Sequence, residues 1–231
     1  MMHENGESPS QLKVNSMAGE LIMCNDMNEL THILVKPEGG RHLKALCDIL
    51  NAHTIHIESS YFIRDWQGLA VRIYLDQLIA YSVRKRCAFA GHLTANLALY
   101  GNYGIALLLR PPGGGCERGI CEVLEAKRML RSNANPWSAK IKIRPNCDVC
   151  TQIQMAIGSE FKLNCTLRDI TIDMNYVHSP DNLQLKTKES IVLEELGILQ
   201  KENEILSDEL NLLSQLGSTA APRRLGLEFC C

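Results

Sequence analysis

The sequence predicts a mainly β protein: an antiparallel, jelly-roll-like sandwich with one or two short helices, followed by a C-terminal coiled-coil helix. Two observations lead to this prediction. Many short segments in the middle of the chain alternate apolar and polar residues, with the two-residue period of half-buried strands. Near the C-terminus a heptad pattern replaces that period, which is typical of a coiled coil.

The composition is that of a globular protein. The chain has 231 residues, of which 45% are hydrophobic and 22% charged, and these values exclude collagen-like and wholly disordered chains. It has no run of about 18 to 20 apolar residues, as a spanning helix needs, and its first residues lack the features of a signal peptide. We therefore expect an intracellular protein whose ten cysteines are reduced.

The N-terminal part predicts a leader, a strand and a helix. Residues 1–28 have no lasting periodicity and predict an irregular or disordered leader. Residues 30–35 (LTHILV) predict a short strand, which Pro37 and the two following glycines end. Residues 42–50 predict a helix, because its apolar side chains recur at helical spacing: Leu43, Leu46, Cys47 and Leu50.

The middle of the chain predicts mostly strands. Residues 55–57 and 69–75 alternate apolar and polar side chains. Residues 89–100 and 105–109 predict two further strands, joined by the four-residue connection GNYG, whose glycines suit a hairpin. Residues 119–130 (GICEVLEAKRML) predict a short helix.

Three more alternating segments complete the predicted sandwich. They are AKIKI, TQIQMAI and DITIDM, at residues 139–143, 151–157 and 169–174. The predicted β domain therefore spans residues 29–182 and ends at the turn-forming residues SPDN.

Residues 188–216 predict the coiled coil, and residues 217–231 a flexible tail. The polar Asn203 in an otherwise apolar seam is typical of two-stranded coiled coils, so we expect self-association. The alternative is an amphipathic helix that packs on its own domain. The seam consists of Val192, Leu196, Leu199, Asn203, Leu206, Leu210 and Leu213.

Positive charge is concentrated in the centre of the chain. Residues 60–145 hold 13 Lys and Arg against 5 Asp and Glu, whereas residues 1–59 and 159–216 are acidic, and the whole chain has a formal charge of −2. This distribution favours binding of a polyanion, although a solvated strand face has the same appearance. The candidate nucleic-acid-binding residues are Arg72, Arg84, Lys85, Arg86, Lys140, Lys142 and Arg144.

Other motifs are weaker. Cys147 and Cys150 form a CxxC pair, and Cys165 and His178 follow without the tight second pair of a zinc finger. The chain contains no nucleophile elbow and no P-loop, so we expect no enzyme and no cofactor. The terminal Cys230 and Cys231 are candidates for lipid attachment and membrane association, with incidental thiols as the alternative.

The central segments resemble a known family. Residues 55–57 followed by GLAVRIYLDQLI resemble the 30K superfamily of plant-virus movement proteins, with Asp76 as the signature aspartate. The segment AFAGHLTANLALYGNYGIALLL is similar to members from reverse-transcribing plant viruses, and the resemblance covers roughly residues 50–180. The chain departs from the family's Asp-x-Arg, because Leu78 stands where the arginine is expected.

The resemblance implies a function in transport. It implies a jelly-roll domain that binds single-stranded nucleic acid without sequence preference and carries viral nucleic acid or particles between plant cells. The expected locations are the host cell cytoplasm and the plasmodesmata, and the expected partners are other copies of the chain, the virion or host plasmodesmal proteins. Two alternatives remain open: a coiled-coil adaptor or structural protein with a protein-binding β domain, and a zinc-binding domain.

Overall fold

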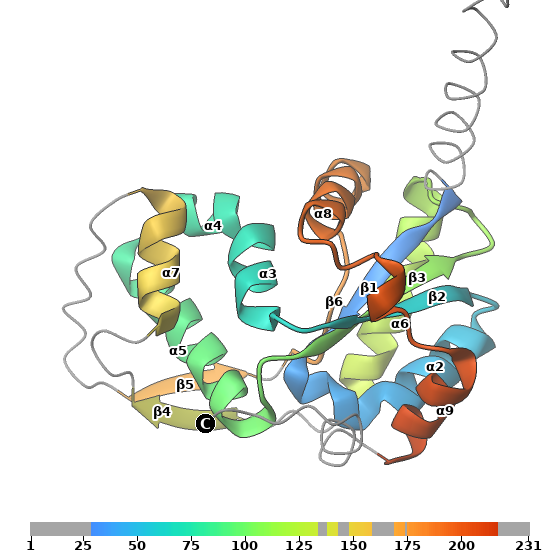
Figure 1. Cartoon of the computed structure of the whole chain (residues 1–231), viewed down its shortest axis with the longest axis horizontal. Helices are drawn as coiled ribbons and strands as arrows, with labels where there is room; N and C mark the ends of the chain where they lie inside the picture. Colours follow the sequence, from blue (N-terminus) through green and yellow to red (C-terminus); the bar gives the residue numbers. More distant parts are fainter. Residues whose placement is uncertain (1–28, 134–137, 143–147, 159–168, 174, 217–231) are drawn as a thin grey trace, which may run out of the picture.

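A four-stranded antiparallel sheet forms the centre of the molecule (Figure 1). The computed structural model describes residues 29–133, 138–142, 148–158, 169–173 and 175–216. The strands are β1 (Thr31–Val35), β2 (His56–Ile63), β3 (Gly104–Arg110) and β6 (Val177–His178), in the order β2-β3-β1-β6. All three neighbouring pairs are antiparallel.

The chain reaches this order through two crossovers. Helix α2 (Leu43–Ala52) connects β1 to β2, and α6 (Glu117–Asn133) follows β3 on the way to β6. Strand β3 lies between β2 and β1, and β1 lies between β3 and β6, so each crossover is split by the insertion of another strand. Apart from the segments inserted between β2 and β3 and between α6 and β6, this is the β-α-β-β-α-β order of split crossovers.

Helices cover both faces of the sheet. Helices α2, α6 and α9 (Ser207–Leu216) cover one face, where Ile33, Val35 and Leu107 are buried (Figure 1). The other face, which holds Leu34 and Ala106, packs in a second core with residues of α3 (Trp66–Ile73), α4 (Leu75–Ala80), α5 (Val83–Tyr100), α7 (Asp148–Ile157) and α8 (Leu183–Glu195). The result is a three-layer α/β structure.

The predicted jelly-roll sandwich is therefore wrong. Strands β1 and β3, helices α2 and α6, and the separate strand pair β4 (Ser138–Lys142) and β5 (Asp169–Asp173) match predicted elements. Three segments that were predicted as strands are helical instead: residues 69–75 lie in α3 and α4, residues 89–100 in α5, and residues 151–157 in α7.

The error at α3 has a physical reason. Side chains Trp66, Leu69, Ala70 and Ile73 are buried, which is the i, i+3, i+4, i+7 face of a helix. Asp65 caps this helix, because its side chain accepts a hydrogen bond from the backbone N–H of Gly68 at 2.9 Å. The alternation of residues 69–75 matched the strand period over a window too short to distinguish the two.

The predicted C-terminal coiled-coil helix is also wrong. Helix α8 ends at Glu195, and Gly197 adopts a φ of 66°, which favours glycine and ends the helical path. A short 3-10 turn, η2 (Lys201–Asn203), follows, and the chain is then fixed to β2 by two hydrogen bonds between Ser60 and Ile205, each of 2.8 Å. Helix α9 begins only after this connection.

Candidate functional site

The predicted nucleic-acid-binding residues are distributed over three elements. Arg72 lies on α3 and forms an exposed ion pair with Glu195 of α8. Arg84, Lys85 and Arg86 lie in the first turn of α5. Arg86 donates hydrogen bonds to the carbonyls of Leu78 and Ile79, so it covers the C-terminal end of α4.

Two further candidate residues, Lys140 and Lys142, lie on β4. Lys140 pairs with Thr171 and Lys142 with Asp169 in the backbone register of β4 and β5. Arg144 lies outside the described residues. The structure thus places Lys140 and Lys142 on one strand and Arg84 to Arg86 on a helix, and binding of nucleic acid by these residues stays a prediction.

The signature aspartate of the family resemblance lies in a helix. Asp76 is in the first turn of α4 and forms an exposed ion pair with Lys188 of α8. The residues around Asp76 are therefore helical in the structure, and the family resemblance itself stays a prediction.

The residues of the predicted seam have different environments. Val192, Leu210 and Leu213 are buried in the two cores of the chain. Leu206 is 63% and Leu196 41% exposed, and Leu199 is partly buried. Asn203 lies in the connection between α8 and α9, where its amide donates a hydrogen bond to the carbonyl of Gly197 at 2.9 Å. The heptad spacing therefore describes two separate helices that contribute to the core.

The predicted zinc ligands are not brought together in the described part of the chain. Cys150 is buried in α7, whereas His178 lies in β6 and is hydrogen-bonded. Cys147 and Cys165, like the terminal Cys230 and Cys231, lie outside the described residues. Within the described ranges, no group of three or more His, Cys, Asp or Glu side chains is placed to hold a metal ion.

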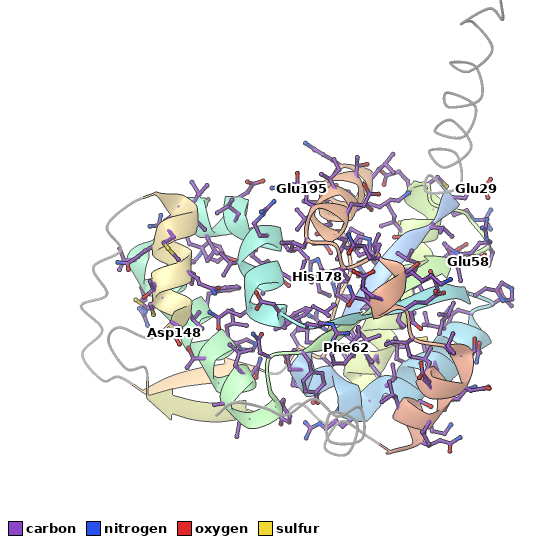
Figure 2. The ribbon with its side chains drawn as sticks, viewed as in Figure 1. Glu29, Glu58, Phe62, Asp148, His178 and Glu195 are labelled. Atoms are coloured by element: carbon purple, nitrogen blue, oxygen red, sulfur yellow. The ribbon has the colours of Figure 1, made fainter. Side chains whose placement is uncertain are left out.

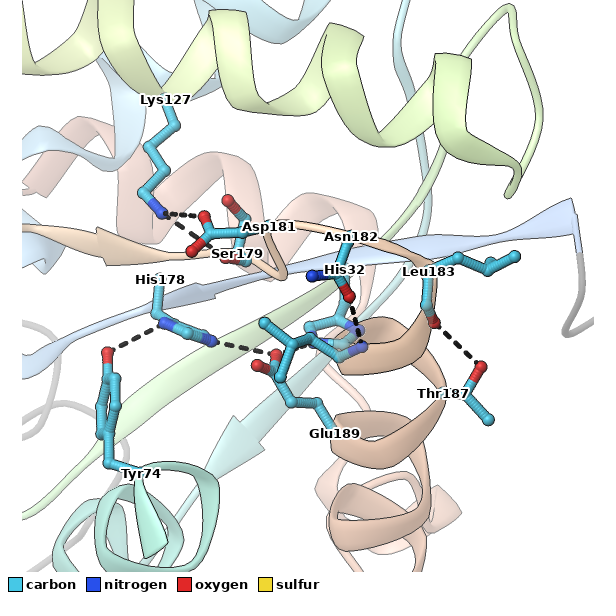
Figure 3. Close-up of polar contacts among 11 residues, drawn as sticks. His32, Tyr74, Lys127, His178, Ser179, Asp181, Asn182, Leu183, Thr187 and Glu189 are labelled. Atoms are coloured by element: carbon cyan, nitrogen blue, oxygen red, sulfur yellow. Dashed lines mark hydrogen bonds and ion pairs between the residues drawn. The ribbon is translucent and has the colours of Figure 1, made fainter. Parts of the chain in front are cut away.

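A buried polar chain of four side chains is the strongest candidate site (Figure 3). Nδ1 of His178 lies 2.8 Å from the hydroxyl of Tyr74, and Nε2 lies 2.9 Å from Oε2 of Glu189. The same carboxylate oxygen lies 2.9 Å from Nε2 of His32. We call Tyr74, His178, Glu189 and His32 the His178 chain.

Four separate elements supply the His178 chain. His32 comes from β1, Tyr74 follows α3, His178 is in β6 and Glu189 is in α8. Figure 2 shows His178 near the middle of the molecule, where the sheet meets these helices. Asn182 caps α8 by accepting a hydrogen bond from the N–H of Leu185 at 2.9 Å, which fixes the helix that carries Glu189.

The charges of the residues in the His178 chain determine which nitrogen of His178 carries the proton and which has the lone pair. Burial raises the pKa of Glu189, but the hydrogen bonds from His178 and His32 outweigh that effect and hold the pKa at about 2. Burial lowers the pKa of His178, and its hydrogen bond to Glu189 offsets this only in part. Near neutral pH an ionised Glu189 therefore accepts a hydrogen bond from Nε2–H of a neutral His178.

Nδ1 of His178 consequently has a lone pair. Burial raises the pKa of Tyr74, so its hydroxyl stays protonated and donates a hydrogen bond to Nδ1. His178 is thus held in one tautomer by a carboxylate on one side, with a basic nitrogen on the other. The side chain of His178 is 13% exposed, so the ring is not closed off from solvent.

Both cationic and acidic side chains act on the His178 chain: Lys36 and Lys127 act on His178, and Glu38 and Asp181 act on Tyr74. Burial is the main cause of the lowered pKa of His178, and the positive charges of Lys36 and Lys127 lower it further. Nζ of Lys127 lies 3.4 Å from the carbonyl of Ser179 and 3.9 Å from Oδ1 of Asp181 (Figure 3). Burial lowers the pKa of Lys36 to about 8, and its ammonium lies 5.9 Å from the ring centroid of Tyr74. An anion next to His178 would compensate these charges.

Ser179 adds an unused polar group next to His178. Its side chain is 1% exposed, and its hydroxyl has no hydrogen-bond partner among the described residues. A buried hydroxyl without a partner costs free energy and is uncommon, unless it serves a ligand or an ordered water.

Of these residues, the sequence predicts a role only for His178, and only as a metal ligand. The missed signal was polar side chains inside strongly apolar segments, namely His32 within LTHILV and His178 directly after Tyr176 and Val177. Glu189 gave no local signal, because its role depends on the packing of α8 against the sheet.

None of the described helices has the length and apolar character needed to cross a lipid bilayer. No family model, no curated protein and no solved structure matches this chain.

Proposed function

We propose that this protein transfers a phosphoryl group through a covalent phosphohistidine at Nδ1 of His178. The observation that carries the proposal is the hydrogen-bonded order Tyr74, His178, Glu189, with Lys36 and Lys127 close enough for their charges to act on the imidazole. Histidine is one of the side chains that form covalent intermediates, and an adjacent group that orients the ring activates it.

The first step is attack on a phosphoanhydride such as the terminal group of a nucleoside triphosphate. The Nδ1 lone pair forms a bond to the terminal phosphorus. The P–O bond to the nucleoside diphosphate breaks, and the nucleoside diphosphate leaves with both electrons of that bond. Glu189 stabilises the positive charge that develops on the ring. Tyr74 gives up its hydrogen bond to Nδ1 and is placed to donate to a phosphoryl oxygen instead.

The second step returns His178 to its starting state. An oxygen of an acceptor phosphate attacks the phosphorus, the N–P bond breaks, and its electron pair returns to Nδ1. Lys36 and Lys127 compensate the negative charge of the phosphoryl group in both steps, as cations do in phosphoryl transfer. The sequence predicts a non-enzymatic protein, and this geometry favours the opposite.

The experiment that tests the proposal is trapping of the intermediate. Purified protein is incubated with ATP or acetyl phosphate labelled at the terminal phosphate, and the protein-bound label is measured after acid and after alkaline treatment. We expect a label that is stable in alkali and lost in acid, as phosphoramidates are, and that is absent from His178→Gln. The matched control is His56→Gln, on an exposed histidine at the start of β2, which should label as wild type does.

Two results would contradict the proposal. One is the absence of label with either donor. The other is equal labelling of wild type and His178→Gln. Release of phosphate without any trapped label would instead indicate that His178 acts as a general base.

Carriage of viral nucleic acid between cells stays a second, untested prediction. The jelly-roll domain that the family resemblance implies is not the fold of this chain, so its remaining support is the cationic content of residues 60–145. Binding to single-stranded RNA and DNA over a salt series tests it, with Lys140, Lys142 and Arg144 changed together to Ala. Binding that does not weaken with salt or with the triple substitution would contradict it.

A further inference from the structure

A second polar cluster lies where the 3-10 segment η1 (Pro37–His42) packs along α5. His92, Asn96 and Tyr100 are spaced four residues apart on α5 and therefore share one face of that helix. The two ends of this row contact η1. Nε2 of His92 lies 3.9 Å from Oε1 of Glu38, and the guanidinium of Arg41 lies 5.9 Å from the ring centroid of Tyr100. Asn96, in the middle of the row, lies on the same face of α5.

The cluster contains buried oxygen atoms without a donor. Glu38 is 0% exposed, and neither of its carboxylate oxygens has a hydrogen-bond partner among the described residues. Asn96 is 2% exposed, and its side-chain oxygen likewise has none there. Unpaired buried acceptors of this kind are costly, and a carboxylate is the most costly of them.

We propose that Glu38, His92 and Asn96 bind a divalent metal cation. The 3.9 Å between His92 and Glu38 is too long for a hydrogen bond. Two ligand atoms that are each about 2.1 Å from one metal ion lie no more than about 4.2 Å apart, so a single ion can bridge the two side chains after a small movement of either one. One imidazole with carboxylate and amide oxygens is an oxygen-rich donor set, which suits Mn²⁺.

The electrostatics of the cluster agree with this assignment. Burial lowers the pKa of His92 to about 4. Burial raises the pKa of Glu38, and the charge of Lys36 counteracts that rise. Neither carboxylate oxygen of Glu38 has a hydrogen-bond partner among the described residues. A bound cation would contact these oxygens directly and compensate their negative charge.

The site also couples to the His178 chain through Lys36. The charge of Lys36 acts on His92 and on His178, so Lys36 lies within electrostatic reach of both groups. A dication at Glu38 repels the Lys36 ammonium, and a phosphate at His178 attracts both cations. Inorganic phosphate should therefore raise the affinity for the metal, and by linkage the metal should raise the affinity for phosphate by the same factor.

The test is a titration of the tag-free full chain with Mn²⁺, in which free Mn²⁺ is measured by electron paramagnetic resonance. We expect one site whose affinity falls by about tenfold or more in Glu38→Gln and several-fold in Asn96→Leu. Glu58→Gln is the matched control, because Glu58 is an exposed carboxylate of β2 that pairs with Arg110, and it should bind as wild type does. Mn²⁺ is used because the ten cysteines would compete for softer metals.

A stability measurement verifies that the variants remain folded. Mn²⁺ should raise the melting temperature of wild type and leave that of Glu38→Gln unchanged. If Glu38→Gln does not fold, His92→Gln takes its place, since the side chain of His92 is 25% exposed and tolerates the change better. Absence of Mn²⁺ binding up to millimolar concentration, or equal binding by wild type and the variants, would overturn the metal site. Since binding is measured without a phosphoryl donor, failure of the phosphohistidine test does not affect this result.

Discussion

Nε2 of His178 and Oε2 of Glu189 lie 2.9 Å apart, although the first residue is in the edge strand β6 and the second is in helix α8. Only 11 positions separate them in the chain. The turn after β6 and the Asn182 cap bring α8 back onto the sheet, and this return places the carboxylate against the imidazole.

Removal of the carboxylate should slow the phosphorylation of His178. In Glu189→Gln the side-chain amide no longer fixes the Nε2–H tautomer, and it no longer stabilises the charge that develops on the ring. We expect the rate of label incorporation to fall by about 10²- to 10⁴-fold. Glu195→Gln, on the same helix but exposed and paired with Arg72, is the control and should keep the wild-type rate. Equal rates for Glu189→Gln and wild type would contradict the orienting role.

The same pair should make the free energy of unfolding depend on pH in the acidic range. The pKa of Glu189 in the folded state, about 2, lies below its ordinary value of 4.5, so the ionised carboxylate favours folding above pH 4.5. That contribution should be lost as the pH falls from 4.5 towards 2. Urea unfolding of wild type and Glu189→Gln across this range measures it. We expect a difference of about 2 kcal/mol near pH 6 that shrinks at low pH, and a constant difference would contradict this account.

The cap of α8 should contribute to stability without taking part in chemistry. Asn182→Ala removes the hydrogen bond to the N–H of Leu185 and should lower the free energy of unfolding by about 1 kcal/mol. Asn182→Asp keeps an acceptor at the same place and should retain most of the stability. Chemical denaturation of the three proteins checks this. Equal losses in both variants would show that the cap is not what stabilises the helix.

Two leucines of the heptad pattern should differ strongly in their effect. Leu213 is 7% exposed and packs in the core beside the sheet, so Leu213→Ala should cost about 2 to 4 kcal/mol. Leu206 is 63% exposed, and Leu206→Ala should change stability by less than about 0.5 kcal/mol. A coiled-coil seam would instead make both residues contribute to an oligomer. Thermal unfolding together with the mass in solution distinguishes these outcomes.

The sequence predicted correctly the elements whose local pattern had one interpretation. The strands at residues 31–35 and 104–110 are short, largely apolar segments, each followed by a proline within two residues, and the helices at 43–52 and 117–133 keep one apolar face over several turns. In these elements local propensity and burial agree. Interpretation from sequence alone was therefore sufficient for them.

The sequence could not predict α3, α5 and α7, or the break after α8. A helix and a strand differ in period only over a longer window than residues 69–75 or 151–157 provide, and the choice depends on which side chains the sheet buries. The heptad from Val192 to Leu213 is regular, yet Gly197 and the contacts of Ile205 with Ser60 divide it into two helices. These contacts join residues that are far apart in the chain.

The composition and the local elements named above follow from the sequence by itself, since they depend on neighbouring residues. The candidate site depends on the tertiary structure alone. His32, Tyr74, His178 and Glu189 come from four elements, and their hydrogen bonds exist because two layers of helices close over one sheet. Burial among those layers then determines which of these groups is charged, and no local pattern in the sequence encodes that.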